Sequence, residues 1–160
     1  MRYESLFYPE APEELYPMLL EQIRAVTQGV PHLVANLANV SAILNEALRD
    51  INWVGFYLME EDRLVLGPFQ GKAACIEIFP GRGVCGRAVS RNEIQLVANV
   101  HLFPGHIACD SASNAEIVVP LRKDGKVVAV LDIDSPTIGR FTSRDREGLE
   151  RLAPVLEGLF

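Results

Sequence analysis

The sequence lacks an even set of cysteines, a cluster of basic residues and a long apolar run, and each absence argues against a class of protein. Its 160 residues contain three cysteines, an odd number that does not fit the disulfide framework of a small secreted domain. No apolar run approaches the ~18 residues of a membrane span. The first residues carry acids and lack the basic segment of a secretory signal. We therefore expect a cytoplasmic protein whose cysteines are free, metal-bound or redox-active.

The charge balance argues against nucleic acid and membrane surfaces as partners. The chain has 15 Lys and Arg against 21 Asp and Glu, a formal net charge of −6, and its basic residues form no cluster. A phosphate backbone or an anionic bilayer would therefore find no electrostatic partner. The sequence shows no repeat, low-complexity tract or flexible linker, so we expect a single domain over residues 1–160.

Apolar periodicity and turn residues predict an α+β fold. In chain order we expect helices at 12–28 and 31–48, strands at 51–59, 63–69 and 74–78, a short helix opening near Val84, a strand at 94–98, a long loop at 99–115, a hairpin over 115–136 and a final helix capped at Thr142 or Ser143. Hairpin connections favour an antiparallel sheet, and helices gathered at the two ends of the chain would pack on it.

The register of the hairpin at 115–136 decides where its acidic side chains point, because a slip of one residue moves every side chain to the other face. We predict a three-residue loop of Lys123, Asp124 and Gly125, which places Glu116 opposite Asp132. One face is then wholly apolar: Ile117, Val119, Leu121, Val127, Ala129, Leu131 and Ile133. The other face carries Val118, Val128 and Val130 near the turn and Glu116, Asp132 and Asp134 at its far end. These carboxyl groups form either one wall of a pocket, with at least one of them protonated near neutral pH, or a solvent-exposed strand end.

All three cysteines lie within residues 75–110. Cys85 follows "PGRG" at the predicted start of a short helix, near two arginines, and both features would stabilise a thiolate. Cys109 lies in a loop of small and polar residues, and Cys75 lies on a short strand. The stretch contains no pair of cysteines or histidines with the spacing of a zinc knuckle, so we expect no metal site. His101 and His106 would instead form hydrogen bonds within their own loop.

Trp53 is the only tryptophan, and it shares one face of a strand with Gly55 and Tyr57. Because glycine has no side chain, Gly55 would leave room for a small apolar ligand group against the indole of Trp53.

Six segments together resemble the free methionine-(R)-sulfoxide reductases, which are stand-alone GAF-domain enzymes. The segments are "NWVGFYL", "LVLGPFQGKAACIEI", "GRGVCG", "HLFPGHIACDSASNAEIVVPL", "VLDIDSP" and "GRF", and the cysteines keep the family's spacing of ten and then twenty-four. One departure is "IEIFPGRG", whose proline stands one position later than in the family pattern. The resemblance implies a single GAF domain over 1–160, with N-terminal helices at about 12–48 and a GAF core at about 50–160. It further implies a six-stranded, mainly antiparallel sheet with the N- and C-terminal helices on one face, a ligand pocket on the other, and a homodimer.

The resemblance also implies an activity and a set of site residues. The reaction is reduction of free methionine (R)-sulfoxide, with thioredoxin as external reductant and without a cofactor. By position in the family motifs, Cys109 would attack the sulfoxide, and Cys85 or Cys75 would then form a disulfide with it. Glu116 and Asp134 would polarise the sulfoxide oxygen, and Asp132 would pair with the substrate ammonium group. Trp53 would pack against the substrate methyl group, with Tyr57 beside it on the same strand face.

Two other functional classes fit parts of this pattern. A non-catalytic GAF module could bind a small ligand, although the chain lacks the "NKFDE"-like sequence of cyclic-nucleotide-binding GAF domains. A redox sensor could use its disulfide as the signal. Only the reductase would convert one sulfoxide epimer stereospecifically.

Overall fold

The computed structural model of the chain describes residues 7–107 and 109–160. In chain order its elements are α1 (Pro12–Thr27), α2 (Leu33–Ala47), β1 (Trp53–Glu60), β2 (Arg63–Gln70), β3 (Glu77–Ile78), α3 (Gly83–Arg91), β4 (Gln95–Val97), the 3₁₀ helix η1 (Val100–Leu102), β5 (Ala115–Lys123), β6 (Lys126–Ser135) and α4 (Ser143–Glu157). Within the described part of the chain, no helix combines the length and apolar character needed to cross a membrane.

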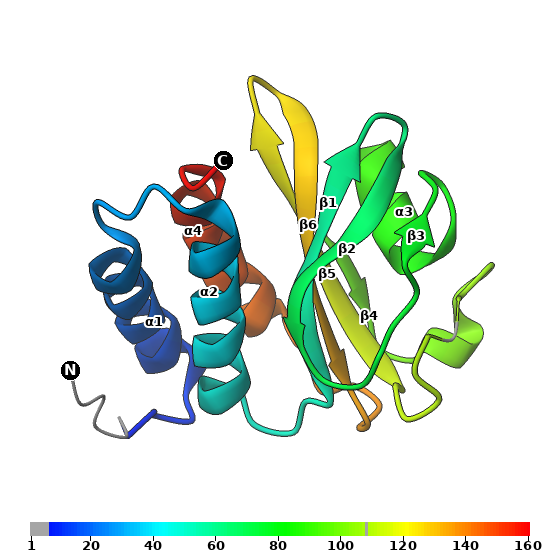
Figure 1. Cartoon of the computed structure of the whole chain (residues 1–160). Coiled ribbons are helices and arrows are strands. Elements are labelled where there is room, and N and C mark those ends of the chain that lie inside the picture. The colour runs from blue at the N-terminus through cyan, green and yellow to red at the C-terminus, as the bar shows by residue number, and fades with distance from the viewer. Residues whose placement is uncertain (1–6, 108) are drawn as a thin grey trace.

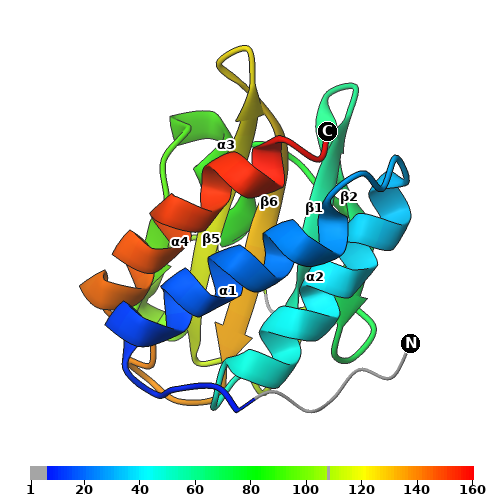
Figure 2. The same cartoon turned by 90° about the vertical axis from the view of Figure 1, so that its left-hand side faces the viewer.

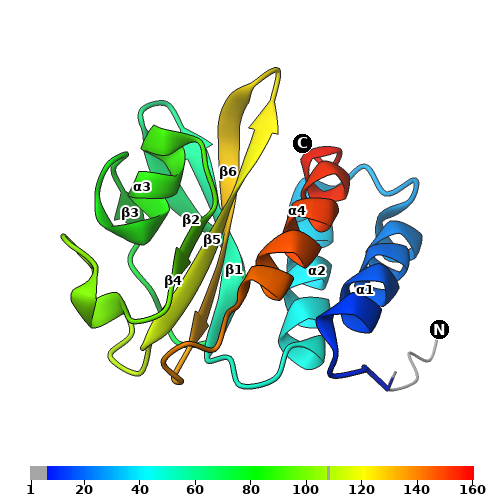
Figure 3. The same ribbon diagram turned by 180° about the vertical axis from the view of Figure 1, so that it is seen from behind.

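The six strands form one antiparallel sheet in the order β3-β2-β1-β6-β5-β4. Helices α2 and α4 lie against one face of this sheet, and α1 covers both of them as an outer layer (Figures 1 and 2). Helix α3 lies on the opposite face, where the view from behind shows it beside β3 and β4 (Figure 3). The predicted α+β architecture, with terminal helices on one face of a six-stranded sheet, is therefore confirmed.

Side chains that alternate between the two faces of the sheet form two separate apolar cores. On β1, Val54 and Phe56 pack in the core beneath the helices, while Trp53 and Tyr57 pack in a smaller core on the α3 side. Successive side chains of a strand point to opposite faces, so each central strand contributes to both cores. The helix-side core makes a rigid platform, and the α3 side keeps polar groups among its apolar residues.

The two helices that begin and end the described chain are joined through one buried polar contact. The Tyr16 hydroxyl on α1 donates a 2.8 Å hydrogen bond to Oδ1 of Asp145 on α4. Asp145 Oδ2 in turn accepts the backbone N–H of Thr142 at 3.0 Å, which completes a capping box at the start of α4. Gly148, one turn further along α4, lets the Tyr16 ring lie directly against the helix backbone.

Most predicted elements are present with small shifts of their ends. The last helix begins after Thr142, one of the two predicted caps. The predicted strand at 74–78 is reduced to Glu77–Ile78, so Cys75 lies outside any strand. The predicted loop at 99–115 contains the short helix η1.

The predicted three-residue loop of the hairpin is wrong. Lys123 pairs with Lys126, and the turn consists of Asp124 and Gly125, both with positive φ, as a type I′ turn requires. The register then shifts between Leu121 and Arg122, which pair with Ala129 and Val127, and this leaves Val128 as the extra residue of a β-bulge.

The bulge moves Glu116 opposite Asp134, where the prediction had placed it opposite Asp132. A displacement of two residues leaves the faces unchanged, so the predicted separation of apolar and acidic faces holds along most of the hairpin. Val127, next to the bulge, is the exception, because it packs in the α3-side core.

Adding a methyl group at Gly148 is expected to destabilise the contact between α1 and α4. The Cβ of an alanine there would lie 2.1 Å from the Tyr16 ring, which is fixed by its bond to Asp145. We expect Gly148→Ala to lower the free energy of unfolding by about 1–3 kcal/mol, as overpacking usually does. Urea denaturation measures the change. The exposed neighbour Glu147 offers the control Glu147→Ala, and equal stability of the two variants would contradict the prediction.

Candidate active site

A small cavity of about 40 Å³ lies on the α3 side of the sheet. Its walls come from β1, from the start of α3, from the segment 106–113 and from the acidic ends of β5 and β6. The residues that line it are Trp53, Tyr57, Ala74, Ile78, Arg82, Gly83, Val84, Cys85, His106, Ile107, Cys109, Asp110, Ser113, Glu116, Asp132 and Asp134. The sequence-predicted site residues other than Cys75 therefore lie around one space.

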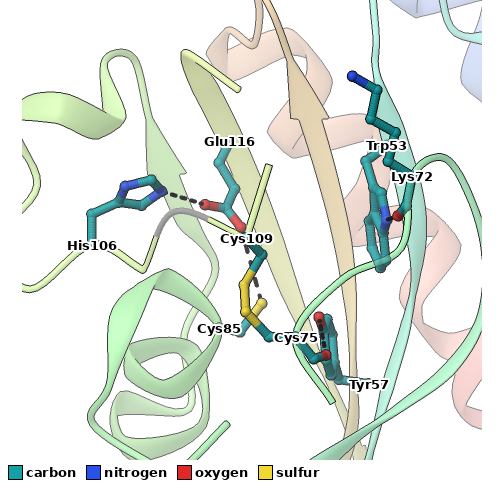
Figure 4. The surroundings of a disulfide bond; sticks show 8 residues. All are labelled: Trp53, Tyr57, Lys72, Cys75, Cys85, His106, Cys109 and Glu116. Atoms are coloured by element: carbon teal, nitrogen blue, oxygen red, sulfur yellow. Dashed lines mark hydrogen bonds and ion pairs between the residues drawn. A yellow bond between two sulfur atoms is a disulfide. The ribbon is translucent and has the colours of Figure 1, made fainter. Parts of the chain in front are cut away.

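A disulfide bond joins Cys75 to Cys109 (Figure 4). It joins the segment before β3 to the loop before β5, with the two Cα atoms 5.6 Å apart. Cys109 lines the cavity and Cys75 does not. The structure thus represents the oxidised form of the chain, and among the two cysteines proposed to resolve Cys109, Cys75 is the bonded one.

Cys85 is a buried free thiol in the first turn of α3. Its Sγ lies 4.0 Å from Oε2 of Glu116. Burial raises the pKa of this thiol well above its usual value, and the neighbouring Asp132 and Glu116 raise it further. The prediction that Cys85 carries an acidic thiol is therefore wrong. Desolvation and the nearby carboxyl groups raise the thiol pKa by more than the helix N-terminus lowers it. Of the two nearby arginines, Arg87 lies over the Phe103 ring, 4.3 Å from its centroid, and Arg82 is exposed.

Glu116, Asp132 and Asp134 form a buried carboxyl cluster. Glu116 and Asp132 are 7% and 6% exposed, which rules out a solvent-exposed strand end. Burial raises the pKa of all three groups, and repulsion from Asp132 raises the pKa of Glu116 and Asp134 further. Hydrogen bonds from Glu116 and Cys85 oppose the rise at Asp132. Burial therefore disfavours the ionised form of every member, and because the three groups interact, they titrate as a set.

Two oxygens of this cluster lack a hydrogen-bond donor. Oδ1 of Asp132 and Oδ1 of Asp134 are buried without a partner among the described residues. Buried acceptors of this kind are costly unless a ligand supplies the donors. The cluster therefore suits a ligand that brings N–H groups or a positive charge. Cys85, Glu116 and Asp132 also offer one donor atom each within 4.8 Å of one another, a spacing that a metal ion could bridge.

Stacked aromatic rings form the apolar wall of the site. The indole of Trp53 stacks on Tyr57 at 5.9 Å and on Phe69 at 5.1 Å between ring centroids. Trp53 Nε1 donates to the carbonyl of Lys72 at 3.1 Å, and the Tyr57 hydroxyl donates to the carbonyl of Cys75 at 3.0 Å. The second bond ties the aromatic wall to the disulfide (Figure 4).

The space beside Gly55 is occupied by protein, contrary to the prediction that a ligand group would fill it. A Cβ at Gly55 would lie 2.2 Å from the Cβ of Phe69. The missing side chain therefore lets β2 approach and places Phe69 on the indole. Any ligand must meet Trp53 from the cavity side.

The two histidines behave differently. His101 Nε2 lies 2.7 Å from Asn114 Oδ1, a local contact as predicted. His106 instead turns into the cavity, where its Nε2 lies 3.9 Å from Oε1 of Glu116. Burial lowers the pKa of His106, so its imidazole is neutral near pH 7.

A hydrogen-bonded group that the sequence interpretation missed holds the loop after Cys109. Asn52 Nδ2 donates to Asp110 Oδ2 at 3.0 Å and lies 3.1 Å from Ser113 Oγ. This contact anchors the residue next to Cys109 to the start of β1. Asn52 and Phe69 both lie in the family-like segments, but no periodicity or spacing argument singles them out.

Comparisons with known proteins agree on the family of this chain. Residues 35–157 match the family model described as "GAF domain". The chain is 56% identical to a free methionine-R-sulfoxide reductase of Escherichia coli over 90% of this chain and 87% of the relative. A Saccharomyces cerevisiae protein of the same name is 45% identical over 90% of this chain and 84% of the relative. The crystal structure of free methionine-R-sulfoxide reductase from Neisseria meningitidis, in complex with its substrate, superposes with a TM-score of 0.94 at 44% identity, covering 99% of this chain and 96% of that one.

Replacing the ionisable carboxyl group of Glu116 with an amide is expected to change how the stability of the protein depends on pH. A carboxyl group with a raised pKa in the folded protein stabilises the fold most below its unfolded pKa, near 4.5, and this contribution is lost as the pH rises toward the folded pKa. The loss amounts to at most about 1.4 kcal/mol per pH unit. We therefore expect Glu116→Gln to be more stable relative to the wild type at pH 8 than at pH 4.5, by about 1 kcal/mol or more.

Urea denaturation at the two pH values measures this difference. The exposed carboxyl at the end of β1 offers the control Glu60→Gln. A Glu116→Gln variant that follows the pH dependence of the wild type would show that the cluster does not hold a proton at Glu116.

Proposed function

We propose that this chain, which belongs to the GAF-domain family of free methionine-R-sulfoxide reductases, reduces free L-methionine (R)-sulfoxide to L-methionine. One observation carries the proposal: the Cys75–Cys109 disulfide joins a residue that lines the cavity, and the same cavity is lined by carboxyl groups whose pKa is raised by burial. Reduction of a sulfoxide needs a soft nucleophile for sulfur and an acid for oxygen, and this cavity offers both.

In the first step the Cys109 thiolate attacks the sulfoxide sulfur. The sulfoxide oxygen takes a proton from Glu116 and passes to Cys109, which leaves methionine and a sulfenic acid. The substrate sulfur gains two electrons, and the cysteine sulfur loses two. Cys75 then displaces the sulfenic hydroxyl group as water and forms the disulfide observed in the structure. Cys85 has no covalent role in this scheme and acts as an S–H donor toward Glu116 and Asp132.

The cavity walls suggest how the substrate lies. The partnerless Oδ1 of Asp132 is our candidate acceptor for the substrate ammonium group. Asp134, opposite Glu116 and with a pKa that burial raises, would help to polarise the sulfoxide oxygen. The substrate methyl group would rest on Trp53, with Tyr57 beside it, and backbone N–H groups of the loop before Cys109 would bind the carboxylate. Burying both charged ends of a single amino acid would exclude methionine sulfoxide within a polypeptide.

The proposal extends to the surroundings of the enzyme. We expect thioredoxin to return the disulfide to two thiols, without a bound cofactor. A homodimer and a cytoplasmic location are also expected from the resemblance to the family.

A single-turnover assay without reductant tests the function. Pre-reduced protein is mixed with racemic free methionine sulfoxide, and the remaining epimers, methionine and free thiols are quantified. We expect loss of the R epimer alone, with about one methionine formed and two thiols consumed per subunit. Persistence of both epimers with all thiols intact would favour the ligand-binding GAF module, and thiol loss to peroxide alone would favour the redox sensor.

Cysteine variants in the same assay separate the roles of the three thiols. Cys109→Ser should form no methionine. Cys75→Ser should form about one methionine and stop at a sulfenic acid, which a dimedone adduct on Cys109 would reveal by mass spectrometry. Cys85→Ser should still form the disulfide. Full single-turnover activity of Cys109→Ser would exclude Cys109 as the nucleophile.

Two aspartate variants should affect different kinetic constants. Asp134→Asn is expected to lower kcat by about 10²-fold with little change in KM, because a group that acts on the developing oxygen charge stabilises mainly the transition state. Asp132→Asn should chiefly raise KM, because it weakens binding of the ammonium group. Steady-state kinetics with free methionine (R)-sulfoxide measures both constants. Normal kcat in Asp134→Asn would remove that residue from the chemical step.

A further inference from the structure

Donor atoms of two chemical kinds meet at one wall of the cavity. Sγ of Cys85 and one carboxyl oxygen each of Glu116 and Asp132 lie within 4.8 Å of one another, and all three residues are buried. The Cys85 thiol points toward the Glu116 carboxyl group (Figure 4). The three residues come from α3, β5 and β6. We expected no metal site from the spacing of cysteines and histidines within residues 75–110, but such spacing cannot detect ligands from three separate elements.

A thiol beside two carboxyl groups selects the kind of metal ion. Mg²⁺ and Ca²⁺ take oxygen ligands, whereas Zn²⁺ binds cysteine thiolate together with carboxylate oxygen. Zinc bonds measure about 2.3 Å to sulfur and about 2.0–2.2 Å to oxygen, so the ion would draw the three atoms together by up to about an ångström. The cavity of about 40 Å³ has room for this ion and a water molecule, although it is too small for an amino acid.

A buried oxygen without a donor points independently to a cation. Oδ1 of Asp132 accepts no hydrogen bond from residues 7–107 or 109–160, although Asp132 is only 6% exposed and lines the cavity. Oδ1 of Asp134, on the same face of β6, is buried in the same way. Such acceptors are costly unless a positive charge or an N–H group reaches them. The cluster thus supplies the ligand atoms for a dication and the negative charge that it would neutralise.

We propose that Cys85, Glu116 and Asp132 form an inhibitory zinc site, at which Zn²⁺ binds in place of the substrate. The inhibitory role rests on the function proposed above, whereas the binding of zinc does not. The two occupants exclude each other because they use the same groups. Oδ1 of Asp132 is the candidate acceptor for the substrate ammonium group, and a zinc ion on Glu116 takes the place of the proton that the sulfoxide oxygen requires.

The number of ligands indicates an exchangeable ion. Thiol and carboxyl groups bind zinc in their ionised forms, so each ligand releases its proton to the solvent as the ion enters. Structural zinc sites close with four protein ligands, whereas three protein ligands leave the fourth tetrahedral position to water. We therefore expect zinc to occupy this site when its free concentration rises and to leave it when a chelator is added.

The oxidised protein gives the sharpest test of binding. The chain has three cysteines, and with the Cys75–Cys109 disulfide formed, Cys85 is its only thiol. Isothermal titration of the oxidised full chain with Zn²⁺ should reveal one tight site, and Mg²⁺ should give no comparable signal. Co²⁺, a spectroscopic substitute for zinc, should produce a thiolate-to-cobalt charge-transfer band in the ultraviolet. Absence of this band in the wild-type protein would overturn the site without the use of any variant.

Variants of the oxidised protein locate the ion. Cys85→Ser and Asp132→Asn should each weaken Zn²⁺ binding by about tenfold or more, since even the loss of a group behind a ligand has an effect of this size. Cys85→Ser should also abolish the cobalt band. His32, exposed at the start of α2, offers the control His32→Gln, which should bind Zn²⁺ like the wild type. Undiminished binding in both site variants, or loss of binding in His32→Gln, would place the ion on the surface and contradict the proposal.

Inhibition is measured with pre-reduced protein in the single-turnover assay. Zn²⁺ should raise the concentration of free methionine sulfoxide that gives the half-maximal rate, without lowering the rate at saturating substrate. Addition of EDTA should restore the original rates. A lower rate at saturating substrate would show that zinc and substrate do not compete, and would overturn the inhibitory role as proposed.

The reduced protein also offers zinc the thiols of Cys75 and Cys109, and Cys85→Ser separates these from the proposed site. This variant keeps both thiols, and its rate with zinc is compared with its own rate without zinc. We expect it to need about tenfold more zinc than the wild type for the same fractional inhibition. Equal sensitivity of the two proteins would assign the inhibition to Cys75 and Cys109 instead.

The two proposals fail separately in these experiments. Wild-type protein that converts neither epimer in the absence of zinc would remove the proposed function and the inhibitory role with it, while the cobalt band would still decide the metal site. Normal turnover of a protein that gives no cobalt band would remove the zinc site alone.

Discussion

Three carboxyl groups in one desolvated cluster impose the main constraint on this structure. Burying an ionised carboxylate without a partner costs far more than a domain of this size can sustain. The fold meets this constraint because burial raises the pKa of all three groups and so favours their neutral forms, while hydrogen bonds from Glu116 and Cys85 limit the rise at Asp132. The proposed chemistry would use the same arrangement, because a carboxyl group with a raised pKa can give a proton to an oxygen.

The rest of the molecule holds this cluster in place. The strands that carry the acids present apolar residues to the helices on their other face, and those residues pack in the larger core. Gly55 pairs with Asp132 on the neighbouring strand, and a side chain at this position would crowd Phe69. The aromatic stack and the disulfide meet at the Tyr57 hydroxyl bond to the Cys75 carbonyl. Apolar packing therefore positions groups that are unfavourable to bury.

The sequence predicted the faces of the hairpin better than its turn. Faces follow from alternation, which survives a displacement of two residues, whereas the bulge at Val128 breaks no hydrophobic pattern and leaves no local signal. The thiol of Cys85 was misjudged for a different reason: a helix N-terminus and two arginines can be read in the sequence, but its burial beside three acids depends on contacts between α3, β5 and β6. Asn52 contacts Asp110 58 positions away, Phe69 stacks on Trp53 16 positions away, and His106 faces Glu116 10 positions away across the cavity. No spacing rule reaches such contacts. The α+β class, the helices and the set of residues at the cavity were accessible because they rest on periodicity and on whole-motif resemblance.

The small cavity next to the disulfide limits the order in which substrates could bind. About 40 Å³ is room for a few water molecules, well below the roughly 300 Å³ at which ligand pockets begin. The cavity of the oxidised form is thus too small for a free amino acid. In the reaction proposed above, amino acid and reductant would then alternate in a ping-pong sequence, and accumulated methionine would compete only for the reduced form. Regeneration would therefore continue unhindered in a cell rich in methionine.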